Sequence, residues 1–239
     1  MKNKLSNKTI LITGASRGLG KTIALALGEQ GAELILHARK MEQLLELKST
    51  FLTLGYKEPT LVILDLLDAE PQDYEALGRS IKLNHTHIDG VIFNAALFHG
   101  LRNVTSMPIS DLDASYRVNL RANVLLTNVL LPLIRLSKGR LLYTSSIVGH
   151  KAWPGWSDYC ITKFALESYS QLVAIENKNE LFVNCIDPGK LRTEMRVKAF
   201  PNEDPMSLPT PEELMPLYVD LMSISSLHGQ VIDGRDYLK

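Results

Sequence analysis

A tyrosine and a lysine four positions apart are the first residues in this sequence whose types and spacing suggest chemistry. Tyr159 and Lys163 lie in the stretch SDYCITK, residues 157–163. On a helix, residues i and i+4 share a face, one turn apart. A free phenol has a pKa of about 10 and is a poor base at neutral pH, whereas a nearby ammonium favours the phenolate. The pair is either a chance arrangement of two common residues or a proton-transfer group with its partner.

A second motif, TGASRGLG at residues 13–20, is suited to binding a phosphate. It closes a short apolar run and precedes an amphipathic segment that we expect to be a helix. Gly14, Gly18 and Gly20 let the backbone turn tightly and approach a pyrophosphate, and the N-terminus of a helix offers free N–H groups. An ordinary turn between a strand and a helix is the alternative. In a doubly wound sheet, however, the first such turn is where a dinucleotide binds.

Seven short apolar segments alternate with segments of helical periodicity. The expected strands lie at 9–14, 32–38, 60–66, 88–96, 139–146, 180–189 and 229–233, and the expected helices at 19–31, 40–55, 70–85, 110–136, 156–178 and from 210 onward. Nearly continuous apolar strands indicate burial on both faces. We therefore predict an α/β fold of the Rossmann type, a doubly wound, seven-stranded parallel sheet with helices on both faces, in one domain spanning 1–239.

Local signals mark the ends of some segments. Ser110 is the expected N-cap of the long fourth helix, and Pro132 falls in its last turns. Thr210, with Glu213 three residues later, predicts a capping box at the start of the final helix. Residues 190–210 form the only long stretch that looks irregular. Loops of that length are commonly lids or binding loops, so we expect the substrate loop there.

The overall composition argues against several functions. Lys plus Arg and Asp plus Glu balance at 26 each among 239 residues, whereas nucleic-acid binding usually requires a basic excess. The longest apolar stretch, NVLLTNVLLPLIRL, is too short and too interrupted to span a bilayer, and no signal peptide is visible. Cys160 and Cys185 show no metal-ligand spacing. We expect a soluble, cytoplasmic protein that binds no metal, nucleic acid or membrane.

Several of these motifs occur together in the order found in one enzyme family. The glycine motif has the spacing Thr-Gly-x-x-x-Gly-x-Gly, Asn119 lies on the long helix, and Ser146 precedes Tyr159 by thirteen residues. The stretch DPGKLRT (187–193) matches Pro-Gly-x-x-x-Thr after the sixth strand. The sequence resembles the single-domain short-chain dehydrogenases/reductases over essentially its whole length. The stretch 195–222 further resembles the YciK-type branch of bacterial oxidoreductases.

Two places depart from the family pattern. FNAA (93–96) stands where the family has Asn-Asn-Ala-Gly, so Phe93 replaces the first Asn and Ala96 replaces the final Gly. The extra methyl group of Ala96 would tighten the floor beneath a cofactor. The C-terminal GQVIDGRDYLK also lacks the usual pair of glycines after an aspartate, which concerns the edge of the oligomer more than the chemistry.

The resemblance implies roles for four side chains. Tyr159 would exchange a proton with the substrate oxygen while hydride moves to or from nicotinamide C4, and Lys163 would lower the pKa of Tyr159 and hold the nicotinamide ribose. Ser146 would bond the substrate oxygen, with Ser145 as the alternative, and Asn119 would position a water that links Lys163 to solvent. The implied cofactor-binding residues are Gly14, Ser16, Arg17, Gly18, Leu19, Gly20, Arg39, Asp65, Leu66, Asn94, Ala95, Ala96, Tyr159, Lys163, Pro188, Gly189, Leu191 and Thr193.

The end of the second expected strand favours NADP over NAD. An NAD-preferring site usually has Asp or Glu there, which bonds the ribose 2′-OH and repels a 2′-phosphate. This chain has Ala38, Arg39 and Lys40 instead. Arg39 can offer a bidentate fork to a phosphate, and Arg17 in the glycine loop can reach the same group. Either arginine could instead be a solvated surface residue. Asp65 resembles the aspartate that contacts adenine in the family.

The substrate side of the site is defined only by position. Its expected walls are 97–99, 147–156 and the loop 190–210. The helices that begin near Ser110 and Trp156 resemble those that pair subunits in the family, so we expect a homodimer or a homotetramer. Two functions are compatible with the sequence: an NADP(H)-dependent oxidoreductase acting on a small carbonyl/alcohol substrate, and a catalytically silent NAD(P)-binding regulator or scaffold. Retention of the Tyr, Lys, Ser and Asn together favours the enzyme.

Overall fold

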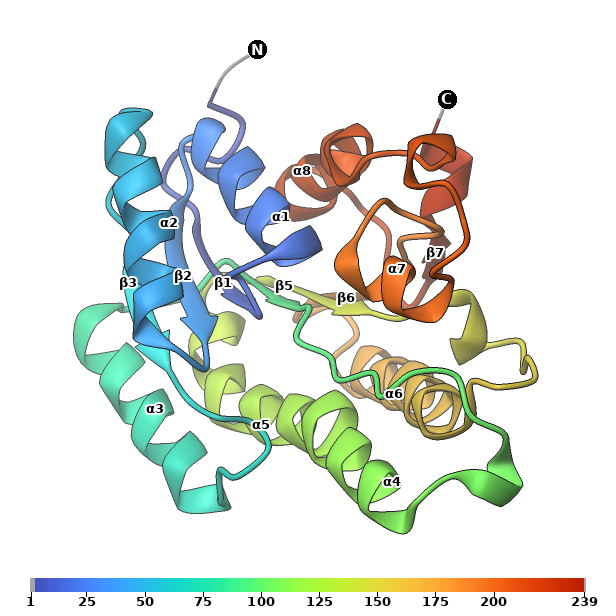
Figure 1. Ribbon diagram of the computed structural model, residues 1–239. Helices are drawn as coiled ribbons and strands as arrows, with labels where there is room; N and C mark the ends of the chain where they lie inside the picture. The colour runs from blue at the N-terminus through green and yellow to red at the C-terminus, as the bar shows by residue number, and fades with distance from the viewer. Residues whose placement is uncertain (1–2, 239) are drawn as a thin grey trace.

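A parallel sheet of seven strands forms the centre of the computed structural model, which describes residues 3–238 (Figure 1). The strands are β1 (Thr9–Thr13), β2 (Glu33–Ala38), β3 (Thr60–Ile63), β4 (Gly90–Phe93), β5 (Arg140–Thr144), β6 (Phe182–Asp187) and β7 (Val231–Asp233). Neighbouring strands are parallel, and their order is β3-β2-β1-β4-β5-β6-β7. The order reverses between β1 and β4. Ligands of such sheets bind outside the carboxyl ends of the strands at this point.

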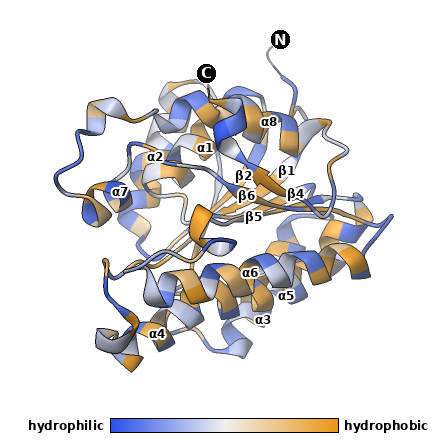
Figure 2. Ribbon diagram, turned by 90° about the vertical axis from the view of Figure 1, so that its right-hand side faces the viewer, coloured by the Kyte–Doolittle hydropathy of each residue, from blue (hydrophilic) through white to orange (hydrophobic). Residues whose placement is uncertain are grey.

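Helices pack on both faces of the sheet, as Figure 2 shows. One face carries α1 (Gly18–Glu29), α2 (Met41–Thr53) and α8 (Met215–Ser223), and the other carries α3 (Pro71–Asn84), α5 (Ala122–Leu136) and α6 (Ser157–Glu176). The predicted fold class, a doubly wound parallel sheet of the Rossmann type with helices on both faces, is therefore confirmed.

The strands are apolar along their length because both of their faces are buried. In β1, Ile10 and Ile12 belong to the apolar cluster formed with α1, α2 and α8, whereas Leu11 between them belongs to the cluster formed with α3, α5 and α6. Successive side chains of a strand point to opposite faces, so a strand that is covered on both sides needs apolar residues at consecutive positions.

The long fourth helix is a continuous run of three helical segments. It consists of α4 (Ile109–Tyr116), five π-helical residues (Arg117–Arg121) and α5. The predicted N-cap at Ser110 is wrong, because Pro108 occupies that position and its carbonyl accepts a hydrogen bond from the N–H of Asp111 at 3.0 Å. Proline holds φ near −65° and has no N–H to satisfy, so it suits the entry to a helix.

The stretch 190–210, expected to be irregular, contains a short helix. The helix α7 (Glu194–Ala199) begins after Thr193, whose Oγ1 accepts a hydrogen bond from the N–H of Arg196 at 3.3 Å. A single 3-10 turn follows at Pro205–Ser207. A helix of 6 residues is too short to show helical periodicity in the sequence, which is why the pattern did not reveal it.

Two other helix signals are confirmed. Thr210 and Glu213 form the predicted capping box, in which Oε1 of Glu213 accepts from the N–H of Thr210 at 2.7 Å. The box opens a 3-10 turn (Pro211–Leu214) that runs directly into α8. Pro132 lies in the last turns of α5. Within residues 3–238, no helix is both long enough and apolar enough to cross a membrane.

Candidate active site

Tyr159 and Lys163 come from neighbouring turns of α6 and lie close together, as their spacing predicted. The ammonium of Lys163 is 5.4 Å from the centre of the Tyr159 ring, and only 6% of Tyr159 and 2% of Lys163 are exposed. The ammonium donates a hydrogen bond to the backbone oxygen of Thr144, the last residue of β5, at 2.7 Å. The pair therefore lies at the carboxyl edge of the sheet.

Burial controls the proton affinity of both groups. Desolvation lowers the pKa of Lys163 to about 8, although Cys185 and Glu167 act in the opposite direction. The pKa of Tyr159 is raised well above its ordinary value, first by desolvation and then by the negative charge of Asp187. From the sequence, we expected Lys163 to lower the pKa of Tyr159, so the direction found here is the opposite one. Tyr159 therefore carries its proton at neutral pH.

Three aromatic side chains, which we call the aromatic wall, enclose Tyr159. The ring centroids of Phe98 and Trp156 lie 5.5 and 5.8 Å from that of Tyr159, and these two rings stack at 5.1 Å. Phe200, which follows α7, lies 6.2 Å from Trp156. Each of the three segments expected to line the substrate site contributes one ring. Trp153, another candidate, is 37% exposed and lies outside the wall.

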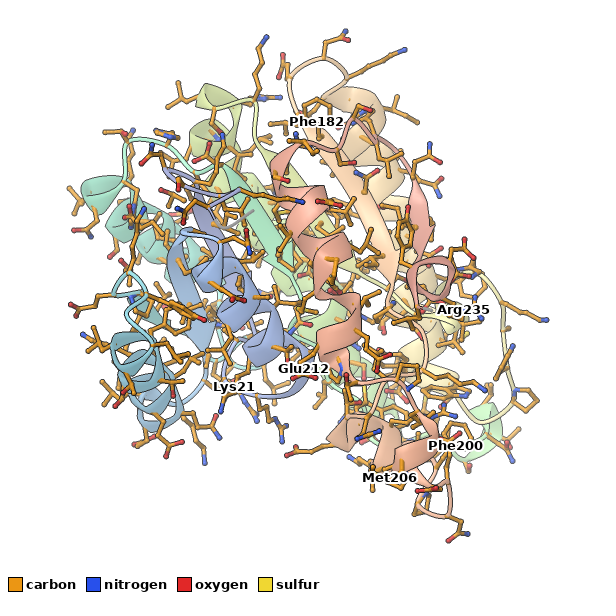
Figure 3. All side chains as sticks on the ribbon, turned by 90° about the horizontal axis from the view of Figure 1, so that it is seen from above. Lys21, Phe182, Phe200, Met206, Glu212 and Arg235 are labelled. Carbon is orange, nitrogen blue, oxygen red and sulfur yellow. The ribbon has the colours of Figure 1, made fainter. Side chains whose placement is uncertain are left out.

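Polar contacts hold α7 over the aromatic wall. The ammonium of Lys198 donates to the backbone oxygen of Phe98 at 2.8 Å. The guanidinium of Arg196 lies 3.8 Å above the Phe200 ring and also donates two hydrogen bonds to Glu203, at 2.5 and 2.6 Å. Figure 3 labels Phe200 at this edge of the molecule. The segment expected to be a loop is thus ordered by its own contacts and is joined to the loop after β4 by Lys198.

The structure distinguishes Ser146 from its neighbour Ser145. The hydroxyl of Ser145 is 2% exposed and donates to Oε1 of Glu167 at 2.5 Å, so its proton is already used. Oγ of Ser146 is partly exposed and accepts only a long bond, from the N–H of Val148 at 3.5 Å. Its own proton is available to a substrate oxygen. The geometry therefore favours Ser146 for the role that the thirteen-residue spacing gave it.

Asn119 lies at the centre of the π-helical segment and is fully buried. Its Oδ1 accepts from the N–H of Leu97 at 2.7 Å, and its Nδ2 donates to the oxygen of Leu97 at 3.0 Å and to Oγ1 of Thr162 at 3.1 Å. Asn119 therefore joins the loop after β4 to the turn of α6 between Tyr159 and Lys163. Single π turns commonly mark functional sites. The water-positioning role expected for Asn119 stays a prediction.

The glycine motif forms a tight turn, which we call the cradle, with no room for side chains at Gly14 and Gly20. Gly14 and Gly18 have φ of 65° and 51°, in the left-handed region that favours glycine. A Cβ atom on Gly14 would lie 2.9 Å from Cα of Ala95, and one on Gly20 would lie 2.5 Å from Nδ2 of Asn94. α1 begins at Gly18, so its first N–H groups lie at the end of this cradle.

The end of β4 is tied to the glycine motif. The N–H groups of Asn94 and Ala95 both donate to Oγ1 of Thr13, at 3.0 Å each. Phe93, the departure from the family pattern, stacks on Tyr143 with ring centroids 4.5 Å apart and is buried in the core. Phe93 therefore packs into the core of the sheet, and the N–H groups of Asn94 and Ala95 keep their hydrogen bonds to Thr13.

His37 in β2 was missed by the sequence analysis. It is 3% exposed; its Nδ1 accepts from the N–H of Gly14 at 3.4 Å, and its Nε2 donates to the oxygen of Leu64 at 3.0 Å. The Gly14 donor fixes this tautomer, and burial lowers the pKa of His37 to about 4. The imidazole thus joins the glycine motif to the end of β3. The only signal in the sequence was a histidine inside an otherwise apolar strand.

The two arginines expected near a 2′-phosphate differ in their surroundings. Arg39 is exposed, and no carboxylate in the described part of the chain pairs with it. Arg17 donates to Glu194 at 2.8 Å, with both side chains largely exposed. Arg39 is therefore available to a ligand, whereas Arg17 would have to share or exchange its partner.

The remaining predicted cofactor residues follow the carboxyl ends of four strands. Ser16 and Leu19 follow β1, Asp65 and Leu66 follow β3, and Ala96 follows β4. Four residues follow β6: Pro188, Gly189, Leu191 and Thr193. Leu66 and Leu191 are buried, and the others are partly exposed. One edge of the sheet thus collects all of these residues, together with Tyr159 and Lys163.

The comparisons with known proteins define the class. The family model of the short chain dehydrogenases matches residues 8–204, and the chain belongs to this family. It is 39% identical over 234 residues to the oxidoreductase YciK of Escherichia coli (strain K12), which covers 97% of this chain and 93% of that protein. The resemblance inferred from the motifs is confirmed.

Two solved structures are also similar to this chain. A short chain dehydrogenase from Shigella flexneri 2a str. 301, complexed with NADP, has a TM-score of 0.96 and 36% identity, and covers 98% of this chain and 100% of that one. Another, from Escherichia coli CFT073 and complexed with NADPH, has a TM-score of 0.96 and 37% identity, and covers 98% of this chain and 99% of that one.

Proposed function

We propose that this protein is an NADP(H)-dependent oxidoreductase that transfers a hydride between nicotinamide C4 and a carbonyl/alcohol substrate, with Tyr159 as the acid/base. The observation that carries the proposal is the buried Tyr159–Lys163 pair at the carboxyl edge of the sheet, enclosed by the aromatic wall. The two similar structures complexed with NADP and NADPH support the choice of cofactor. In this chain, Arg39 is exposed and has no carboxylate partner among residues 3–238, which supports the same choice.

The residues present fit a dinucleotide. Gly14 and Gly20 let the cradle pack tightly against Ala95 and Asn94. Gly18 adopts the left-handed conformation of its turn, and the first N–H groups of α1 would bind the pyrophosphate. Arg39 would bind the 2′-phosphate. Lys163 would hold the nicotinamide ribose beside Tyr159.

The protonation of the site favours reduction of a carbonyl. When bound, NADPH supplies the hydride. Tyr159, which carries its proton at neutral pH, donates it to the substrate oxygen, where negative charge develops. Ser146 donates a second hydrogen bond to this oxygen. Lys163, with a pKa of about 8, can then return a proton toward the phenolate.

The alternative is a catalytically silent NAD(P)-binding regulator or scaffold. The fold alone fits both functions. A silent protein has no use for a buried phenol and ammonium at 5.4 Å beside a serine with a free proton, so the geometry favours the enzyme. A homo-oligomeric state, a small-molecule substrate and a cytoplasmic location stay predictions.

The oxidation of NADPH by a panel of ketones, aldehydes and quinones tests the proposal. Tyr159→Phe keeps the ring and removes the proton donor, so turnover should fall by about 10²–10⁴-fold, while the Kd of NADPH stays within about twofold. If the Phe variant kept most of its rate, the assignment of Tyr159 would be wrong. Tight NADPH binding without turnover of any carbonyl would favour the regulator.

A further inference from the structure

Glu167 is a buried carboxylate on α6 to which the proposed reaction gives no role. It lies four residues after Lys163, one turn further along the same face of the helix, and only 5% of it is exposed. Its Oε1 accepts a hydrogen bond from the hydroxyl of Ser145 at 2.5 Å and lies 3.1 Å from Nδ1 of His150. An ionised carboxylate only accepts, so His150 is the donor in the second contact. Glu167 therefore joins α6 to two points on the segment 145–150.

The segment 145–150 carries Ser146 between these two contacts. The side chain of Ser146 caps a single 3-10 turn that ends at Gly149. A Cβ atom on Gly149 would lie 2.4 Å from Oε1 of Glu167 and 2.3 Å from Oγ of Ser145, so this position has no room for a larger residue. The carboxylate thus packs directly against the turn and holds it from both ends.

Ser146 and Tyr159 come from different elements, although both are proposed to bind the same substrate oxygen. Ser146 follows β5, whereas Tyr159 lies on α6. The distance between their hydroxyl groups therefore depends on how the segment 145–150 is attached to α6, and Glu167 provides two side-chain bonds there. A displacement of about 1 Å in a group that binds the transition state can lower a rate about 10²-fold.

We propose that Glu167 is a positioning residue, which holds the hydroxyl of Ser146 at the distance from Tyr159 that the substrate oxygen requires. The inference rests on the proposed oxidoreductase function and adds to it a residue that acts through Ser146. The charge of Glu167 also raises the pKa of Lys163, against the larger desolvation that lowers it to about 8. The carboxylate therefore acts from one position on both the serine and the lysine that accompany Tyr159.

A double-mutant cycle tests whether Glu167 acts through Ser146. The reaction is the reduction by NADPH of the carbonyl compound that the wild type reduces fastest in the panel, at pH 6.5, below the pKa of Lys163. Glu167→Leu removes both bonds, so kcat should fall by about 10-fold to 100-fold while NADPH binding is unchanged. In a Ser146→Ala background the same substitution should cost less than about twofold, because residues that act together are not additive. An equal cost in both backgrounds would show a general structural defect and overturn the proposal.

Two further variants serve as controls. Glu167→Gln keeps an oxygen that accepts from Ser145 and His150, so its kcat should return to within about threefold of that of the wild type. Glu176→Leu removes an exposed carboxylate from the same helix and should leave kcat unchanged in both backgrounds. Should Glu167→Leu fail to fold by circular dichroism, Ser145→Ala removes one of the same bonds and takes its place in the cycle.

Amide hydrogen exchange separates this inference from the proposed activity, because it needs no turnover. The N–H of Gly149 donates to the oxygen of Ser146 at 2.8 Å. Glu167→Leu should speed exchange in the segment 145–150 by about tenfold or more, and Glu176→Leu should not. If this increase is found but no carbonyl compound is reduced, Glu167 does hold the segment and the proposed activity fails. If the wild type is active but exchange in the segment is the same in Glu167→Leu, the activity stands and positioning by Glu167 is refuted.

Discussion

The guanidinium of Arg17 donates a hydrogen bond to the carboxylate of Glu194 at 2.8 Å, and this contact joins the glycine motif to the first turn of α7. Arg17 is also one of the two arginines that the sequence places near a 2′-phosphate. A 2′-phosphate bound as we propose would therefore compete with the carboxylate of Glu194 for this donor.

Glu194→Gln should tighten NADPH binding and leave NADH binding unchanged. The two side chains are 68% and 76% exposed, so their ion pair is weak, and its removal should improve the NADPH Kd by only about twofold to fivefold. Salt screens exposed charges, so the gain should fade at high ionic strength. Fluorescence titrations of both cofactors at low and high salt measure it. An equal gain for NADH would show that Arg17 does not sense the 2′-phosphate.

Arg39→Asp should reverse the cofactor preference of the wild type, which we expect to be for NADPH. The substitution removes a charge-assisted bond, worth about 1.5–3 kcal/mol when well formed, and sets a carboxylate against the phosphate. The same carboxylate can accept a bond from the free 2′-OH of NAD. Arg17 remains and can make the switch partial. Equal wild-type affinity for NADH and NADPH, or an unaltered ratio of the two affinities in the variant, would show that Arg39 is only a solvated surface residue.

His37 should make the protein less stable in mild acid. Its pKa is about 4 in the fold, against an ordinary 6.5, so the unfolded chain takes up the proton first as the pH falls. The part of the free energy of unfolding that depends on neutral His37 is fully present above pH 6.5 and is lost as the pH falls toward 4. This loss amounts to about 3 kcal/mol. His37→Gln does not titrate. Urea unfolding of both proteins between pH 7 and 4.5 should show that the wild type loses more stability than the variant. If the two free energies of unfolding fell in parallel with pH, this role of His37 would be refuted.

The outer face of α6 should pair two subunits. Ile161, Phe164, Leu172 and Ile175 lie on this helix with 41–74% of each residue exposed, more apolar surface than a helix facing water normally shows. We expect light scattering to give the molecular mass of a dimer or tetramer. Leu172→Lys should shift this mass toward that of the monomer. Leu52→Lys, at a similarly exposed position of α2, is the control. A wild-type monomer at micromolar concentration would contradict the prediction.

Sequence patterns were sufficient for the strands, for the longer helices and for the central pair. Continuous apolar strands require burial on both faces, and Ile10, Leu11 and Ile12 show that burial directly. The i, i+4 spacing of Tyr159 and Lys163 is a local property of one helix, so the sequence determines that they lie close together.

Contacts between distant segments could not be predicted in the same way. His37 reaches Gly14 and Leu64 only because three strands lie side by side. The direction of the pKa shift of Tyr159 depends on burial and on Asp187, neither of which is visible in local spacing. The helix α7 was missed because 6 residues are too few to show a period.

The enclosure of Tyr159 has a kinetic consequence. Tyr159 is 6% exposed beside Trp156, against which Phe200 packs. We therefore expect a substrate to reach it only after the α7 segment, which Lys198 joins to Phe98, has moved. Movement of this segment displaces solvent and is retarded by friction, whereas hydride transfer inside the closed site is not. We therefore expect added sucrose, through its viscosity, to slow turnover of a good substrate more than that of a poor one.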